Sequence, residues 1–197
     1  MNSFETVLSR RSINLDITYR CTLECPKCLR RAIPTNNLDD LSLKNFKKII
    51  KHFDQIEFCG QISDPIFHPQ FIEFLKLTTN KRVFVHTAAS HKSMDWYTDA
   101  FNANKNATWE FGIDGLPQDS HKYRINQNGE YLFKVMKAGV ELGNDIRWQY
   151  IIFKYNENDI TQAIDLAQRH KISIHINKSS RWKGSDDPYK PSEVNCA

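Results

Sequence analysis

The sequence predicts an α/β protein built on a parallel sheet of six strands with helices outside it. Two observations predict this class. Apolar and polar residues alternate in short runs, as at residues 13–19, which is the period of a strand. Between such runs apolar residues recur at helical spacing, as at Leu43, Phe46 and Ile50. Strands that alternate with helices form right-handed βαβ units, whose strands are parallel.

The first half of the chain contains three strands and three helices in alternation. We expect strands at residues 13–19, 55–59 and 82–87, and helices at residues 43–53, 69–75 and 93–103. The segment 39–42 offers cap residues for the first helix. Pro69 suits the first turn of the second helix, where its missing N–H is not needed.

The second half repeats the pattern. We expect strands at residues 108–113, 147–153 and 172–176, and helices at residues 131–142 and 159–170. Gly143 is placed to end the first of these helices. Six strand–helix repeats are too few for a closed barrel of eight strands.

Bulk composition indicates one domain with an ordinary core. The chain has 197 residues, of which 40% are hydrophobic and 12% aromatic. Its net charge of +4 is mild and no Lys/Arg block stands out, so nucleic acid is not indicated as a partner. No apolar run approaches the ~20 residues of a membrane span. The polar N-terminus does not resemble a secretory signal, so we expect a cytoplasmic protein with reduced thiols.

Cys21, Cys25 and Cys28 directly follow the first predicted strand. Three thiolates in such a short loop can hold three corners of a metal cluster and leave a fourth corner open for chemistry. The spacing alone supports an iron–sulfur cluster and a structural zinc ion equally. Cys59 or a histidine would complete the zinc site.

The surroundings of the cysteines resemble the radical S-adenosylmethionine (radical SAM) enzymes, from about residue 13 to residue 176. The cysteine loop matches the Cys-x-x-x-Cys-x-x-Cys motif of that family, and residues 62–65 look like its Gly-Gly-Glu-Pro segment. Residues 111–116 and 121–124 are similar to the fourth strand and loop of members that carry a C-terminal cluster-binding extension. The resemblance implies an open, partial (βα)6 TIM-like barrel.

The same resemblance implies a domain organisation and cofactors. Residues 1–180 would form the core domain, and residues 181–197, which are polar and lack periodicity, an extended C-terminal tail without the usual extension. The three cysteines would hold a [4Fe–4S] cluster whose fourth iron binds S-adenosylmethionine. A reductant such as a flavodoxin or ferredoxin would supply the electron that cleaves S-adenosylmethionine. The resulting 5′-deoxyadenosyl radical would take a hydrogen from the substrate.

The predicted binding residues follow the strands, where parallel βα folds place their sites. Groups between Gln61 and Asp64 would meet the amino group of S-adenosylmethionine, and Arg124 would pair with its carboxylate. Nucleoside contacts would fall to backbone groups or to strand five, near Gln149 and Tyr150. The complete set of predicted cofactor contacts is Lys27, Gly60, Gln61, Ser63, Asp64, Ala88, Gly112, Asp114, Arg124 and Gln149.

Three positions depart from the family pattern. Lys27 stands where an aromatic residue is common, Ala88–Ala89 where Asn-Gly is common, and Gly112 where a small polar residue is common. An inactive relative that keeps the cluster and the fold is therefore one alternative. No catalytic residue is assigned.

The substrate expectation follows from the short barrel. An open barrel leaves its mouth uncovered, so we expect a substrate large enough to cover it, namely a peptide, a protein or another macromolecule. Nucleotide modification and activation of a glycyl radical enzyme are the other reactions of this kind. A non-catalytic zinc-binding module is the alternative from a different class.

Overall fold

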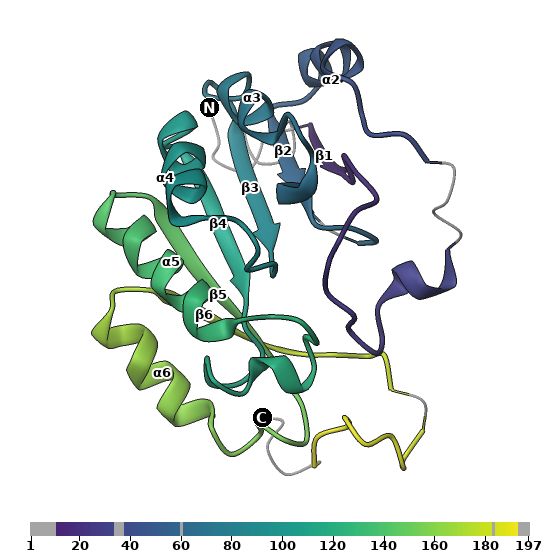
Figure 1. The fold of residues 1–197 in the computed structure, drawn as a ribbon, viewed down its shortest axis with the longest axis vertical. Helices are drawn as coiled ribbons and strands as arrows, with labels where there is room; N and C mark the ends of the chain where they lie inside the picture. The colour runs from purple at the N-terminus through teal and green to yellow at the C-terminus, as the bar shows by residue number, and fades with distance from the viewer. Residues whose placement is uncertain (1–10, 34–37, 60, 183, 193–197) are drawn as a thin grey trace, which may run out of the picture.

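The computed structural model describes residues 11–33, 38–59, 61–182 and 184–192. Within them, six strands form a single parallel sheet in chain order (Figure 1). The strands are β1 Ser12–Leu15, β2 Gln55–Phe58, β3 Arg82–Thr87, β4 Ala107–Gly112, β5 Asp145–Ile152 and β6 Ser173–Lys178. The predicted α/β class and the open six-stranded parallel sheet are confirmed.

In the described residues, five α-helices connect or follow these strands, together with short 3-10 turns. The helices are α2 Leu43–Ile49, α3 Phe71–Lys76, α4 Met94–Ala103, α5 Gly129–Glu141 and α6 Ile160–Arg169. The 3-10 turns are η1 Leu29–Ala32, η2 Ile50–His52, η3 Pro65–Phe67 and η4 Ser120–Lys122. No helix in the described part of the chain is both long and apolar enough to cross a bilayer.

Helix starts follow local chemistry. The side chains of Ser42, Ser93 and Asn128 accept hydrogen bonds from backbone N–H groups in the first turns of α2, α4 and α5. The predicted start at Pro69 is wrong by two residues, because Gln70 is the N-cap and α3 begins at Phe71.

Strand β1 is shorter than the alternation predicted. It ends at Leu15 because the following backbone pairs with the segment before α2 rather than with β2. The carbonyl of Ile17 accepts a hydrogen bond from the Leu41 N–H, and Thr18 Oγ1 donates to Asp40 Oδ1 at 2.7 Å. Apolar alternation continues past the end of the ladder, so sequence alone places the boundary too late.

The two faces of the sheet differ. Helices cover one face (Figure 1), and the side chains on that face are buried and apolar, including Trp109, Phe111 and Trp148. On the other face, which is the inner side of the partial barrel, Phe84 and Glu110 remain partly exposed. The helix-facing side therefore holds the hydrophobic core, and the carboxyl end of the sheet is left for a site.

Candidate functional site

Asp64, in the loop after β2, is a buried carboxylate that is 4% exposed. Its oxygens accept hydrogen bonds from Thr87 Oγ1 at 2.8 and 2.9 Å, and from the N–H groups of Ala88 and Ala89 at 2.9 and 3.1 Å. Burial raises the pKa of Asp64, while these hydrogen bonds act in the opposite direction. Asp64 thus joins the loops that follow β2 and β3, and it holds Ala88 in place.

The neighbouring predicted contacts lie around the end of β1. Ser63 Oγ donates to Asp16 Oδ1 at 2.8 Å, and the Ile62 N–H reaches the same oxygen at 3.4 Å. Gln61 is exposed. Gly60 lies outside the described residues.

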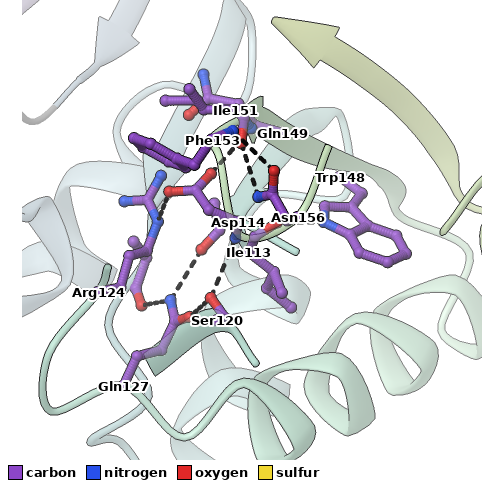
Figure 2. Close-up of polar contacts among 12 residues, drawn as sticks. Ile113, Asp114, Ser120, Arg124, Gln127, Trp148, Gln149, Ile151, Phe153 and Asn156 are labelled. Carbon is purple, nitrogen blue, oxygen red and sulfur yellow. Dashed lines mark hydrogen bonds and ion pairs between the residues drawn. The ribbon is translucent and has the colours of Figure 1, made fainter. Parts of the chain in front are cut away.

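Asp114 and Arg124 form a buried ion pair after β4 (Figure 2), with Arg124 Nε 2.8 Å from Asp114 Oδ2. Asp114 Oδ1 also accepts a hydrogen bond from the Ile151 N–H at 3.0 Å. Burial by itself would lower the pKa of Arg124, but the Asp114 carboxylate raises that pKa above its ordinary value. The guanidinium therefore stays charged in a nearly closed environment.

Gly112 has a steric role beside this pair. A Cβ atom at Gly112 would lie 2.6 Å from Arg124 Nη2 and 2.8 Å from Cζ, closer than packed atoms allow. The guanidinium therefore lies against the bare Cα of Gly112. This contact gives a physical reason for the glycine at a position where the family that the sequence resembles commonly has a small polar residue.

Gln127 is a site residue that sequence reasoning missed. Its side chain is 6% exposed, and Nε2 donates to the carbonyls of Ala88 at 2.5 Å and Gly112 at 2.8 Å, while Oε1 accepts a hydrogen bond from Ser120 Oγ (Figure 2). It links the ends of β3 and β4 where the ladder stops. A glutamine in a polar loop is ordinarily exposed, so the sequence around Gln127 does not indicate that its side chain is buried.

The cysteine loop lies beside the Arg124 loop. The Glu24 N–H donates to the Ile125 carbonyl at 3.1 Å, and Asn126 Nδ2 donates to the Thr22 carbonyl at 3.1 Å. These contacts bring the loop after β1 to the loop after β4, although more than a hundred residues separate them. Together with the contacts of Asp64, they gather the ends of four strands.

All three thiols of the loop are half-buried and outside any disulfide. Cys21 Sγ accepts a hydrogen bond from the Leu23 N–H at 3.4 Å, and the Cys28 N–H donates to the Cys25 carbonyl at 3.1 Å. Burial, with the nearby charge of Asp64, raises the pKa of Cys21 to about 12. Burial also raises the pKa of Cys25, against the effect of Arg124. Without a metal, Cys21 and Cys25 therefore favour the neutral thiol.

Two arginines support the backbone of this loop. Arg30 Nη2 donates to the Leu23 carbonyl at 2.6 Å, and Arg31 Nη2 donates to the Glu24 carbonyl at 2.8 Å. Both arginines follow Cys28 in η1 and reach back over the loop. The loop is therefore fixed by side chains rather than by sheet or helix hydrogen bonds.

The three cysteines of the loop supply thiols, which both zinc ions and iron–sulfur clusters bind. Within the described residues, no three His, Cys, Asp or Glu side chains are placed to hold one metal ion. A zinc ion needs its ligands about 2.0–2.3 Å from one point. An iron–sulfur cube is larger and separates its thiolates, and three thiols with an N–H···S hydrogen bond are suitable donors for it.

Lys27 points toward the C-terminal tail. Its Nζ lies 2.5 Å from Asp187 Oδ2, and its carbonyl accepts a hydrogen bond from Arg181 Nη1 at 3.4 Å. The Tyr189 ring packs on the edge of Tyr123, with centroids 5.2 Å apart. Residues 184–192 thus include a segment that packs beside the cysteine loop.

Gln149 lies on β5 next to β4 (Figure 2). Its carbonyl accepts a hydrogen bond from the Ile113 N–H at 3.1 Å, and its Nε2 donates to Glu110 Oε1 at 3.1 Å. Gln149 pairs in register with Gly112. Its side chain is thus on the inner face of the sheet, where it hydrogen-bonds to Glu110 at a position level in register with Gly112.

Several solved structures have a fold similar to that of this chain. The sequence matches no protein-family model and no curated protein. Among solved structures, Streptococcus suis SuiB bound to the precursor peptide SuiA is similar, with a TM-score of 0.77 and 14% identity over 93% of this chain and 42% of SuiB. TYW1 with a lysine-pyruvate adduct gives a TM-score of 0.66 and 14% identity over 95% of this chain and 73% of TYW1.

A third similar structure is anSMEcpe with bound AdoMet and the Cp18Cys peptide. It gives a TM-score of 0.66 and 10% identity over 90% of this chain and 54% of that one. These proteins are radical SAM enzymes, and the chain spans less than half the length of SuiB. The predicted partial-barrel fold of that class is confirmed.

Proposed function

We propose that this chain is a radical SAM enzyme whose Cys21, Cys25 and Cys28 hold a [4Fe–4S] cluster. One observation carries the proposal. Three half-buried thiols outside any disulfide lie on a loop that is hydrogen-bonded to the Arg124 loop, at the carboxyl edge of a partial barrel. Parallel βα folds place their active sites at this edge.

The residues around the cysteines supply binding groups for S-adenosylmethionine. Arg124 is charged and would hold the carboxylate through the guanidinium nitrogens that Asp114 does not engage. Backbone groups near Ala88, fixed by Asp64 and Gln127, would meet the nucleoside. Ser63 and the backbone around Gln61 would bind the amino group. When bound, the two cofactors would supply one-electron cleavage of S-adenosylmethionine and a radical that takes hydrogen from a substrate.

A peptide is the substrate class that we propose. Two of the similar structures have peptides in their titles, the precursor peptide SuiA and the Cp18Cys peptide. The inner face of the sheet carries partly exposed polar side chains that such a chain would contact. A flavodoxin or ferredoxin would act as the electron donor, as for enzymes of this class.

Anaerobic reconstitution with iron and sulfide tests the cluster. We expect a brown protein with about four irons and four sulfides per chain. The Cys25→Ala variant should lose the colour. The Cys59→Ala variant is the matched control, because Cys59 is also half-buried and outside any disulfide but lies at the end of β2. It should keep the cluster.

Turnover is tested by adding dithionite and S-adenosylmethionine and measuring 5′-deoxyadenosine. We expect the nucleoside from the wild type and the Cys59→Ala variant, and none from the Cys25→Ala variant. One zinc ion per chain without sulfide would instead establish the structural zinc module. A complete cluster without nucleoside would establish an inactive relative.

A further inference from the structure

A carboxylate with two imidazoles forms a polar cluster on the inner face of the sheet. Glu110 on β4 lies between His86 on β3 and His175 on β6. The Nδ1 atom of His86 is 3.1 Å from Glu110 Oε1, and the Nδ1 atom of His175 is 3.0 Å from Glu110 Oε2. Gln149 Nε2 donates to Oε1 at 3.1 Å. Three strands thus converge on one carboxylate.

The protonation of the two rings follows from their shared partner. Burial by itself would raise the pKa of Glu110, but the hydrogen bonds and charges of His86 and His175 hold that pKa below its usual value. An ionised carboxylate only accepts hydrogen bonds, so both Nδ1 atoms must carry a proton. Whenever such a ring is neutral, its proton is on Nδ1 and its Nε2 is an acceptor.

Both Nε2 atoms are available to a ligand. Among the described residues, no hydrogen bond engages Nε2 of His86 or His175. The side chains of these residues are 33% and 44% exposed. Both residues are on the inner face of the sheet, because His86 pairs in register with Glu110, and His175 with Gln149. Each ring therefore has one nitrogen fixed by the carboxylate and one nitrogen that is accessible from the inner face.

The cluster lies below the predicted cofactor site. Gln149, which pairs in register with Gly112, also pairs with His175 on β6. His86 precedes Thr87, whose hydroxyl binds Asp64 at the carboxyl edge. A substrate that enters the partial barrel toward the cofactors would thus meet these imidazoles. The geometry does not suit a metal ion, because the rings use their Nδ1 atoms on the carboxylate between them.

We propose that His86 and His175 form a proton-transfer site for the substrate, with Glu110 and Gln149 as positioning residues. This proposal rests on the proposed function. The substrate group is a hydroxyl, a thiol or an ammonium group of a peptide. Its X–H bond breaks, the electron pair stays on X, and the proton forms a new bond to Nε2. The Glu110 carboxylate compensates the positive charge of the resulting imidazolium, as carboxylates do for catalytic histidines.

Chemical labelling tests this site without a known substrate. The reconstituted protein is treated with diethyl pyrocarbonate at pH 8, above the ordinary histidine pKa of about 6.5, and the modified histidines are mapped by mass spectrometry. His121, which is exposed on η4, serves as the reference. We expect His86 and His175 to react faster than His121, because a hydrogen bond from Nδ1 to a carboxylate increases the electron density on Nε2.

The Glu110→Gln variant should slow the labelling of His86 and His175 by roughly threefold or more, because the rings lose their anionic partner. Labelling of His121 should not change, and Glu110→Asp should restore part of the rate. Wild-type protein in which His121 reacts but neither inner-face histidine does would overturn the proposal. An unchanged rate in Glu110→Gln would also overturn it.

A second measurement needs no variant and no cofactor turnover. Nitrogen-15 spectra of histidine-labelled protein should show both rings with the proton on Nδ1. The opposite tautomer in both rings would refute the proton-transfer site and leave the cluster and its turnover untouched. A chain that fails to assemble the cluster would refute the proposed function, whatever the labelling result.

Discussion

The two faces of the sheet use the same strands for different purposes. On the helix-covered face, alternate residues such as Val85, Trp109 and Phe111 are fully buried and carry the core. On the inner face, the residues between them, such as His86 and Glu110, keep part of their surface exposed. The contrast indicates that the fully buried apolar face stabilises the fold, whereas the inner face keeps polar side chains accessible. A series of variants ordered by burial tests this view.

The largest effect is expected from Phe111→Ala on the buried face. The phenyl ring is fully buried and stacks on Trp109, with centroids 5.8 Å apart. Its removal leaves a cavity and should lower the free energy of unfolding by roughly 3–5 kcal/mol. Urea denaturation measures the change.

The matched variant on the inner face is Phe84→Ala. That ring is partly exposed, with Arg82 Cζ 5.0 Å from its centroid. We expect a loss of roughly 1–2 kcal/mol from lost apolar contact and cation–π attraction. Equal losses for the two phenylalanines would contradict the distinction between the faces.

Asp64→Ala tests whether burial, rather than apolar character, determines how much a side chain contributes to the free energy of unfolding. The substitution removes the acceptor for Thr87 Oγ1 and for the N–H groups of Ala88 and Ala89. Buried donors without partners should reduce the free energy of unfolding by roughly 2–4 kcal/mol. Asp54→Ala, at an exposed carboxylate near Arg11, should change it by less than about 0.5 kcal/mol. If the two variants unfold at the same urea concentration, burial of the carboxylate does not determine its contribution to stability.

Lys27→Met occupies the middle of the series. The side chain of Asp187 is almost fully buried, and Lys27 is its ion-pair partner. Its loss should cost roughly 1–2 kcal/mol and make the segment 184–192 more sensitive to limited proteolysis. Lys76→Met, which removes an exposed pair with Glu73, is the control and should leave the proteolysis pattern unchanged. Equal proteolysis in the two variants would argue against the packing of the tail on the cysteine loop.

The smallest effect belongs to Glu110→Gln on the inner face. Because the pKa of Glu110 is lowered in the folded state, its contribution to stability is present above the ordinary glutamate value of about 4.3. That contribution disappears as the pH falls through the lower folded pKa. The free energy of unfolding of the wild type should exceed that of the variant by no more than about 1 kcal/mol at pH 6, and the difference should shrink as the pH falls below about 4. If the difference in the free energy of unfolding between wild type and variant grew as the pH fell, it would contradict a lowered pKa for Glu110 in the folded state.

Sequence patterns were sufficient for the order and direction of the strands. Strand β3 begins and ends as predicted, because its alternating residues lie between a turn and a loop. The end of β1 was predicted too late, since the pairing of Ile17 with Leu41 depends on a contact between distant segments. Periodicity reports which side of a strand is buried and says nothing about where a ladder stops.

The candidate site was predictable where residues are neighbours in the chain and not where they meet through the fold. The cysteines and Asp64 stood out by their spacing. Gln127 did not, because its partners are carbonyl groups on two other strands. The sequence also did not indicate that His86 and His175 converge on Glu110, because this follows only from the register of β3 through β6.

An open barrel has two edge strands. In the described part of the chain, β1 and β6 each pair on one side only. Such borders can recruit strands from other molecules and lead to aggregation. Here β1 is only four residues long, and β6 presents exposed Ser173, His175 and Asn177. The shortness of β1 and the exposed polar residues of β6 therefore disfavour the addition of a further strand at either edge.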